Sequence, residues 1–319
     1  MSDVFIMFCE SSGRRDRVKD VLSYGMPKNA SLSLGPARRV SIQIITAALL
    51  IVALARSASA QQRPLITEDP EVIGAGRILI EGGIDGAHDV HYPLSGLEGN
   101  LWRLPTLGVS FGIGAIAELQ IDGGPYNHLS ITKRSPAPLS TLVTATGNST
   151  SDVEDLVVAT KIRVLPEAAH HPSVGVRFAT RLPNASNESG LGLDTTDFIA
   201  TLLAAKTVES IRVVGNIGTG ILADPLAGHE QNDVLVYGLS VARAVTDRAE
   251  MVAEVVGRVS TRKEAFPGTE SRGLLNLGAR YTRGPIRFDA AIFFGLTSLD
   301  PTVGFTTGFT YVFHAFDVP

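Results

Sequence analysis

The sequence predicts an all-β protein, a closed antiparallel transmembrane β-barrel of about 12 strands. Apolar and polar residues alternate with a period of two over segments of roughly ten residues or more, whereas strands of globular sheets usually have about five or six. About ten residues is the length that a tilted strand needs to cross a bilayer. An even number of strands is typical of barrels whose two ends lie on the same side of the membrane.

The alternating segments define the expected strands. We expect strands over 77–88, 101–112, 115–133, 153–164, 173–182, 196–207, 210–222, 233–244, 249–260, 272–282, 285–296 and 303–314. Segment 115–133 can also be read as two strands.

The predicted connections alternate between short and long. The short ones lie near 112–114, 166–172, 208–210, 245–247 and 283–285, and the long, polar ones cover 89–100, 134–152, 183–195, 223–232 and 261–271. Short periplasmic turns and longer extracellular loops are typical of outer-membrane barrels.

The stretch GFTTGFTYVFHAF, 304–316, carries large aromatic side chains on one face and small ones on the other. In a barrel the aromatic face meets lipid, and no sheet edge stays open in hydrocarbon. Strand 303–314 must therefore pair with the first strand, near 77–88. This stretch resembles the aromatic strand on which Gram-negative barrels end, and the resemblance implies recognition by the assembly machinery, although here HAFDVP follows Phe313. The expected partners are outer-membrane lipid, the barrel-assembly machinery, periplasmic chaperones and a small-molecule solute.

The first part of the chain is predicted to direct export. Residues 38–60 combine a basic start, an apolar run and a small-x-small site formed by Ala58 and Ala60, which is the layout of a cleaved signal peptide. A membrane anchor is the alternative, but the apolar run is shorter than the ~20 residues of a spanning helix. Residues 1–37 are expected to be a poorly ordered extension, with the true start further along the chain.

Export also agrees with the cysteine content. Cys9 is the one cysteine of the chain, so the mature protein would have none, which suits the oxidising periplasm and excludes a disulfide framework. Residues 61–76 are expected to lie in the periplasm or to plug the pore partly, and residues 77–319 to form the barrel.

Charged residues fall on the face opposite the apolar one, and a charge on the lipid face would cost ~2–4 kcal/mol at mid-membrane. We therefore expect the charged side chains to point into the lumen. Two interpretations remain open: the charges pair and fill the interior, or they line a narrow conduit with a transverse field, because twelve strands lie between filled barrels of about eight and open porins of about sixteen. The candidates are Glu118, Asp122, Lys161, Arg163, Arg177, Arg181, Arg212, Glu250, Glu254, Arg258, Arg280, Arg287 and Asp289.

The sequence indicates no catalytic, cofactor or metal site. HDVH at 88–91 and His170-His171 are more simply solvated turns than metal ligands, and GNIGTG at 215–220 lacks the helix that phosphate binding needs. No spacing selects a serine, histidine and carboxylate set, so we expect a protein that is not an enzyme. A net charge of −4 and a pI near 6.0 give no reason to expect nucleic acid.

Several short motifs occur together in the second half of the chain. They include Asp155 before the strand with Lys161, an Arg-Phe strand that ends at Leu182-Pro183-Asn184, and the runs GLG at 190–192 and DTTD at 194–197. With these motifs, most of 100–314 resembles the outer-membrane family named for the MetA pathway of phenol degradation. The resemblance implies a barrel in the outer membrane, and it carries over no functional residue.

The predicted function is an outer-membrane channel of a Gram-negative bacterium for passive passage of small molecules, aromatic or hydrophobic ones included, without a cofactor. One alternative is a non-conducting structural or surface-binding barrel. A second is a soluble periplasmic barrel that binds an apolar ligand, which requires apolar residues inside and polar ones outside.

Overall fold

The computed structural model describes residues 63–317. The predicted signal peptide with Ala58 and Ala60, and the extension before it, lie outside these residues. Among the residues described, no helix is long and apolar enough to cross a membrane. The chain forms one antiparallel sheet of the strands β1 (Arg77–Tyr92), β2 (Leu97–Gly112), β3 (Ala117–Gly123), β4 (Asn127–Arg134), β5 (Ser149–Asp152), β6 (Leu156–Leu165), β7 (Ser173–Leu182), β8 (Asp197–Val208), β9 (Ile211–Ala223), β10 (Gln231–Ala244), β11 (Ala249–Ser260), β12 (Arg272–Arg283), β13 (Ile286–Gly295) and β14 (Val303–His314).

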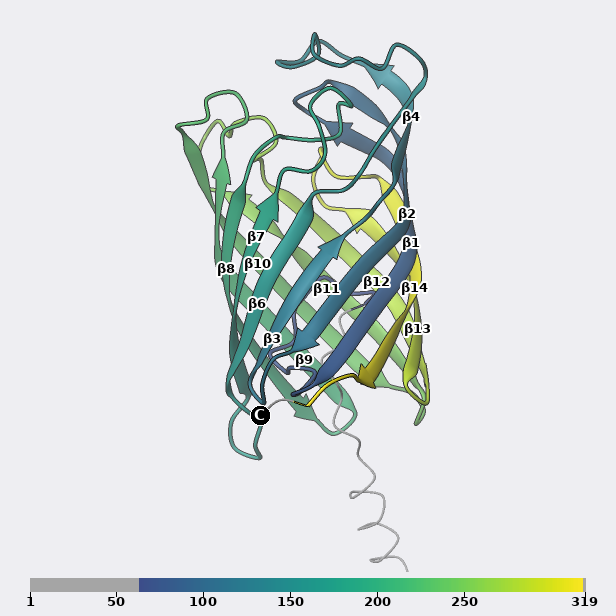
Figure 1. Ribbon diagram of the computed structural model, residues 1–319, viewed down its shortest axis with the longest axis vertical. Coiled ribbons are helices and arrows are strands. Elements are labelled where there is room, and N and C mark those ends of the chain that lie inside the picture. The colour runs from purple at the N-terminus through teal and green to yellow at the C-terminus, as the bar shows by residue number, and fades with distance from the viewer. Residues whose placement is uncertain (1–62, 318–319) are drawn as a thin grey trace, which may run out of the picture. The chain divides into compact units, whose positions relative to one another are not determined.

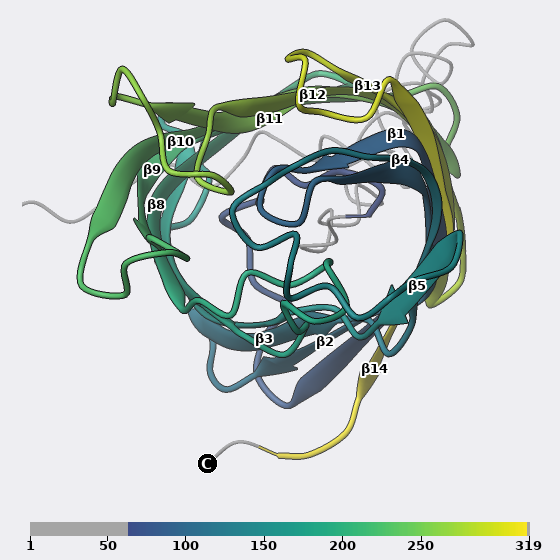
Figure 2. The ribbon, with the colours of Figure 1, turned by 90° about the horizontal axis from the view of Figure 1, so that it is seen from above.

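The sheet closes into a barrel because β1 pairs with both β2 and β14 (Figures 1 and 2). Twelve strands form the ring. β4 pairs with the first part of β2, and β5 pairs with β4, so that these two strands extend the sheet at one end. The predicted closed antiparallel barrel is confirmed, together with the pairing of 303–314 with 77–88. Closure leaves no free strand edge in the ring, so the backbone hydrogen bonds are satisfied within the sheet.

The segment 115–133, predicted as one strand or two, forms two strands. β3 and β4 are separated at 124–126, where Pro125 has no N–H to donate to a ladder. β2 pairs with β3 through 107–112 and with β4 through 97–103, so both pieces occupy one place in the ring. β5 and β6 are divided in the same way and pair with β4 and β3 respectively.

The predicted long loop 89–100 is wrong. β1 continues to Tyr92 and β2 starts at Leu97, so that only residues 93–96 connect them. The register shifts between Ala87 and Val90, where Asp89 takes a φ of 56°. A bulge of this kind moves the side chains to the other face of the strand, which hides the period of two from a reading of the sequence.

The two faces of the barrel wall differ sharply in polarity. On the outside, Phe178, Phe288 and Ile292 are each more than half exposed. Their neighbours along the same strands point inward, and Arg287 and Asp289 are only 7% and 4% exposed. The protein therefore has its apolar residues outside and its charges inside, the reverse of a soluble barrel.

The C-terminal strand follows the same rule. Phe305 and Phe309 are exposed on the outside of β14, whereas Thr310, which follows Phe309, is fully buried. Phe305 meets Trp102 edge to face with ring centroids 5.6 Å apart, and Tyr311 stacks on Phe313 at 5.3 Å. The aromatic face of 304–316 thus lies on the outer surface and does not enter a core.

Candidate functional site

The segment 63–76 lies inside the ring of strands (Figure 2). It leaves β1 at the rim with the short turns, where the N–H of Gly76 donates to the Gly112 carbonyl at 2.9 Å. A Cβ at Gly112 would lie 1.8 Å from the carbonyl oxygen of Gly74, so glycine is required for this close approach. From there the segment runs into the barrel and contacts inward side chains of many strands.

The acidic residues of the segment each meet a basic side chain of the wall. The pairs are Glu68 with Arg177 at 2.9 Å, Asp69 with Arg212 at 2.5 Å, and Glu71 with Arg163 at 2.5 Å. The basic side chains come from β6, β7 and β9, so one side of the lumen is positively charged and binds the acidic half of the segment.

Arg63, at the other end of the segment, binds the opposite side of the lumen. Its guanidinium lies 3.5 Å from Asp289 and 4.0 Å from Asp85, and it donates to the hydroxyls of Thr106 at 3.0 Å and Thr306 at 2.8 Å. The charge pattern of the segment is therefore complementary to the two sides of the lumen.

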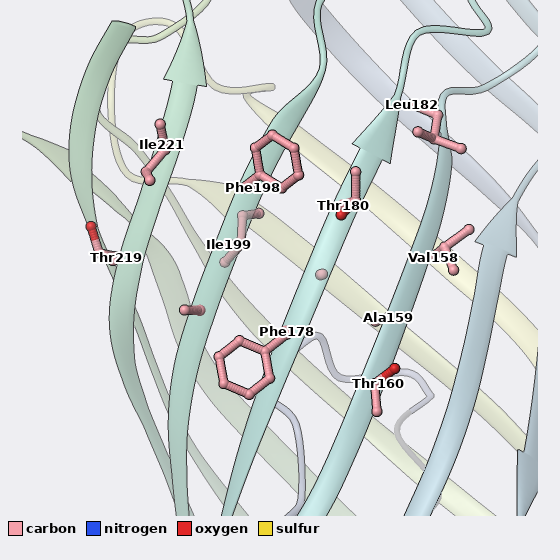
Figure 3. Close-up of a pocket in the computed structure, with 12 residues that line it drawn as sticks. Val158, Ala159, Thr160, Phe178, Thr180, Leu182, Phe198, Ile199, Thr219 and Ile221 are labelled. Carbon is pink, nitrogen blue, oxygen red and sulfur yellow. The ribbon is translucent and has the colours of Figure 1, made fainter. Parts of the chain in front are cut away.

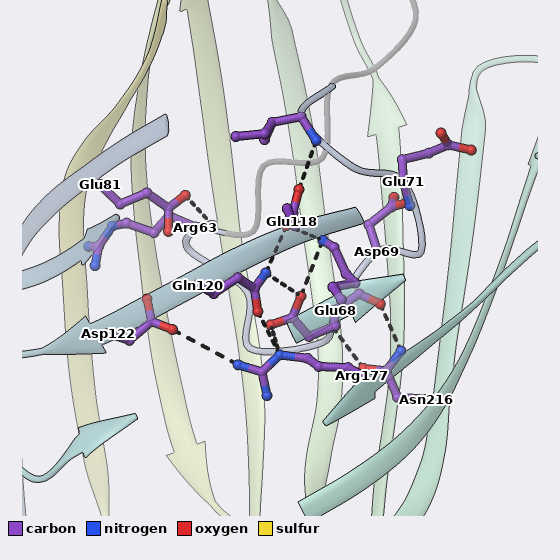
Figure 4. A network of polar contacts seen from close by, with 12 residues as sticks. Arg63, Glu68, Asp69, Glu71, Glu81, Glu118, Gln120, Asp122, Arg177 and Asn216 are labelled. Carbon is purple, nitrogen blue, oxygen red and sulfur yellow. Dashed lines mark hydrogen bonds and ion pairs between the residues drawn. The ribbon is translucent and has the colours of Figure 1, made fainter. Parts of the chain in front are cut away.

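A buried charge network joins the segment to β3 and β6 (Figure 4). Lys161 is fully buried, and its Nζ lies 3.0 Å from Glu118 and 3.5 Å from Glu68. Glu118 also accepts the N–H of Ile73 at 2.8 Å, and Gln120 donates to it at 2.9 Å. Because buried charges are costly without partners, these contacts keep the network neutral and hydrogen-bonded.

Wall side chains also satisfy the backbone of the segment, which has no regular secondary structure. Glu254 accepts the N–H groups of Ile66 and Thr67, both at 2.7 Å. The amide of Asn216 accepts from the N–H of Glu68 at 2.7 Å and donates to its carbonyl at 2.8 Å. The barrel interior thus supplies the partners that a sheet or helix would otherwise give.

The structure brings most of the candidate lumen residues together around the segment. Those that contact it directly are Glu118, Lys161, Arg163, Arg177, Arg212, Glu254, Arg280 and Asp289. The others lie beside these residues or nearer the long-loop rim: Asp122 is 3.9 Å from Arg177, Glu250 is 3.8 Å from Arg280, Arg181 binds Asp155 and Asp197, Arg287 is 7% exposed on β13, and Arg258 donates to loop carbonyls.

Sequence reasoning missed the residues of the segment itself and two carboxylates of β1. The missed residues are Arg63, Glu68, Asp69, Glu71, Glu81 and Asp85. The run TEDPE at 67–71 was the available signal, because its three carboxylates match the basic residues on the inner faces of β6, β7 and β9.

Three cavities lie between the segment and the long-loop rim, with volumes of about 440, 390 and 380 Å³. All three are lined by Ile66, a residue that is 54% exposed, together with charged and apolar groups of the wall. A depression of about 510 Å³ between Phe178 and Phe198 is different, because its lining contains no charged side chain (Figure 3). Of these four hollows, the three with charged side chains in their walls therefore lie in the interior of the barrel.

The short turn 166–172 adds a further contact to Arg212. Burial raises the pKa of Glu167, but hydrogen bonds from Thr207 and Arg212 outweigh it and hold the pKa below its ordinary value. A carboxylate with a depressed pKa stabilises the fold above the unfolded-state pKa, and this contribution is lost as the pH falls through the folded-state pKa. Glu167 therefore contributes at neutral pH and stops contributing in acid.

We expect Glu167→Gln to lower the unfolding temperature by a few degrees at pH 7, because the charged hydrogen bonds from Thr207 and Arg212 are weakened. Below the folded-state pKa, where the native carboxyl is also neutral, the variant and the native protein should unfold alike. The measurement is the temperature at which folded-barrel gel migration is lost, with Glu188→Gln in an exposed loop as control. An equal difference at both pH values would contradict the assignment.

Within residues 63–317, no group of three histidine, cysteine, aspartate or glutamate side chains is placed to hold a metal ion.

Comparison with known proteins shows a likeness in fold. No family model and no curated protein sequence matches the chain.

Solved structures do resemble it. An outer membrane channel from Pseudomonas putida F1 has a TM-score of 0.53 and 14% identity, covering 77% of this chain and 98% of that one. The NanC porin has a TM-score of 0.47 and 9% identity over 73% of this chain and 98% of that one. The translocator domain of NalP from Neisseria meningitidis has a TM-score of 0.43 and 13% identity, covering 88% of this chain and 97% of that one. The first of these likenesses shows the β-barrel fold.

Proposed function

We propose that this protein is an outer-membrane channel through which small molecules pass passively, and that segment 63–76 is its plug. The observation that carries the proposal is the reversed polarity of a closed barrel, with exposed Phe178, Phe288 and Ile292 outside and paired charges around cavities inside. In a bilayer the outward apolar side chains contact hydrocarbon, whereas in water they would form a wide exposed apolar belt.

The proposed solutes are small molecules, aromatic or hydrophobic ones included. Apolar groups of Leu65, Ile66 and Ile199 share the cavity walls with the charges, so a partly apolar solute would find contacts there. The resemblance to the family named for the MetA pathway of phenol degradation supports the same class. The Pseudomonas putida protein of similar fold is an outer membrane channel, in agreement with the proposed role.

A non-conducting barrel is the second candidate function. It is favoured by one observation, the ion pairs that hold the plug on both sides of the lumen through Arg63 and Glu68. In that case the barrel would act through its long loops and not through its interior.

The proposed location is the outer membrane of a Gram-negative bacterium. We infer export by the predicted signal peptide that ends at Ala60 and insertion with outer-membrane lipid around the apolar face. The aromatic strand 303–314 is the element that we propose the barrel-assembly machinery recognises, after delivery by periplasmic chaperones.

Fractionation followed by transport assays tests the proposal. We expect the protein in the outer-membrane fraction, with gel migration that changes on boiling, and we expect the refolded protein to give discrete conductance in planar bilayers and solute uptake into liposomes. A membrane-bound barrel with neither conductance nor uptake would contradict the channel and leave the non-conducting barrel. Recovery in the soluble periplasm would contradict both.

A further inference from the structure

The cavity of about 390 Å³ combines an apolar wall with guanidinium groups. It lies on the long-loop side of Ile66 and is lined by residues of the strands β7 to β12. Its volume falls in the range that binds small organic molecules. The apolar lining consists of the side chains of Ile66, Ile199, Val236, Val256 and Leu274. A ligand for this cavity therefore needs an apolar body.

The charges that line this cavity do not balance. Arg177 is paired with Glu68 at 2.9 Å, and Arg272 lies 3.9 Å from Asp300. Arg258 lines the same cavity and, among residues 63–317, has no carboxylate oxygen within 4.0 Å of its guanidinium. The cavity is thus left with one positive charge.

Backbone carbonyls hold Arg258 in place. Its Nε donates to the carbonyl of Glu270 and its Nη2 to the carbonyl of Gly268, both at 2.8 Å. Nη1 has no hydrogen-bond partner in the part of the chain that the structure describes. Arg272 is fixed in a similar way by the carbonyls of Leu299 and His91.

Arg258 and Arg272 are directly opposite each other on the paired strands β11 and β12. Like charges in this position destabilise a sheet, and an anion between them would remove the repulsion. Carboxylates bind guanidinium groups through charge-assisted hydrogen bonds, which are stronger than neutral ones. Two fixed guanidiniums with one unbalanced charge are suited to a monoanion.

We propose that Arg258 and Arg272 form a binding site for a small organic monocarboxylate with an apolar body, a substrate class that rests on the proposed channel function. The carboxylate receives a hydrogen bond from Nη1 of Arg258, and the apolar body lies against Val236, Val256 and Leu274. The two arginines bind the anionic group, and the apolar wall makes the site prefer an organic carboxylate to chloride or phosphate.

Calorimetric titration of the folded protein in a non-ionic detergent tests the site, with benzoate as the probe and benzyl alcohol as its neutral counterpart. We expect benzoate to bind more tightly than benzyl alcohol, and Arg258→Gln to weaken benzoate binding about tenfold while leaving benzyl alcohol unchanged. Arg272→Gln is a second, independent variant and should also weaken benzoate binding. Arg243→Gln, on the exposed outer part of β10, is the control with the same loss of charge.

Equal binding of benzoate and benzyl alcohol to the native protein would overturn the site, as would unchanged benzoate binding in both arginine variants. Displacement of benzoate by an equal concentration of chloride would overturn the role of the apolar wall. Bilayer recordings separate this site from the channel proposal. Benzoate binding without conductance contradicts the channel alone, and conductance without benzoate binding contradicts the site alone.

Discussion

Removal of residues 63–73 is expected to raise the conductance of the barrel by a factor on the order of five, the largest functional effect that the structure predicts. A barrel of this size is wide enough for an aqueous lumen only if the interior is not filled. Here the filling includes the segment that Glu118, Lys161 and Glu254 hold inside the ring. Single-channel recording of the native and shortened proteins gives the comparison.

A reversible version of this experiment uses a disulfide bond. A Cβ built on Gly238 lies 3.5 Å from the Cβ of Thr67, within the range that a disulfide bridges. Cys9 precedes the predicted cleavage site at Ala60, so the mature double variant Thr67→Cys/Gly238→Cys would carry only the two new thiols. Oxidation should hold the segment in place and lower the conductance below that of the native protein. Reduction should restore the native conductance.

The single variants Thr67→Cys and Gly238→Cys serve as controls because neither can form the bond. If the shortened protein and the oxidised double variant both conduct like the native protein, the segment is not the plug. If the shortened protein fails to fold, the comparison of oxidised with reduced double variant still decides the question. If the segment is the plug, the conductance of the double variant depends on the redox state of this one engineered bond.

Local alternation was enough to predict the ring of strands. The bounds of 173–182, 249–260 and 303–314 agree with β7, β11 and β14, because one face of each of these strands is largely apolar and no bulge interrupts the period of two. The alternation also assigns each charge to one face of its strand. These properties depend on neighbouring residues in the chain and on the difference between lipid and water.

Features that depend on distant pairing were not predictable in the same way. The bulge near Asp89 follows from how β2 meets β1, and the division of β2 between β3 and β4 follows from the pairing on its other side. The partners of the charged residues also depend on the whole fold. Arg163 and Arg177 do not face Glu254 across an open lumen, because segment 63–76 lies between them and binds both sides.

Replacement of Lys161 by methionine should have the largest effect on stability, about 3–5 kcal/mol. The fully buried ammonium contacts Glu118 and Glu68, and without it two carboxylates stay in the interior with less positive charge nearby. Methionine has a similar length, so little packing is lost with the charge. The free energy of unfolding can be measured by urea titration of the barrel in lipid vesicles.

Lys133→Met is the matched control. Lys133 pairs with Glu98 at 3.0 Å, but its side chain is 62% exposed, and pairs of this kind contribute about 0–1 kcal/mol. A loss in Lys161→Met no larger than in Lys133→Met would show that the network around Lys161 does not stabilise the fold. The two variants remove the same charge and differ in burial, so burial is the quantity that the comparison tests.

The same substitution also separates the barrel from its plug. Glu68 belongs to segment 63–73, whereas Glu118 belongs to β3, so in the shortened protein Lys161 keeps only Glu118 as a carboxylate partner of this network. Lys161→Met should therefore cost less in the shortened protein than in the full one, and the difference measures the coupling between Lys161 and the segment. An equal loss in both proteins would mean that Lys161 stabilises only the wall. A smaller loss would mean that one buried ammonium holds both the barrel and its plug, so that movement of the segment requires this network to open.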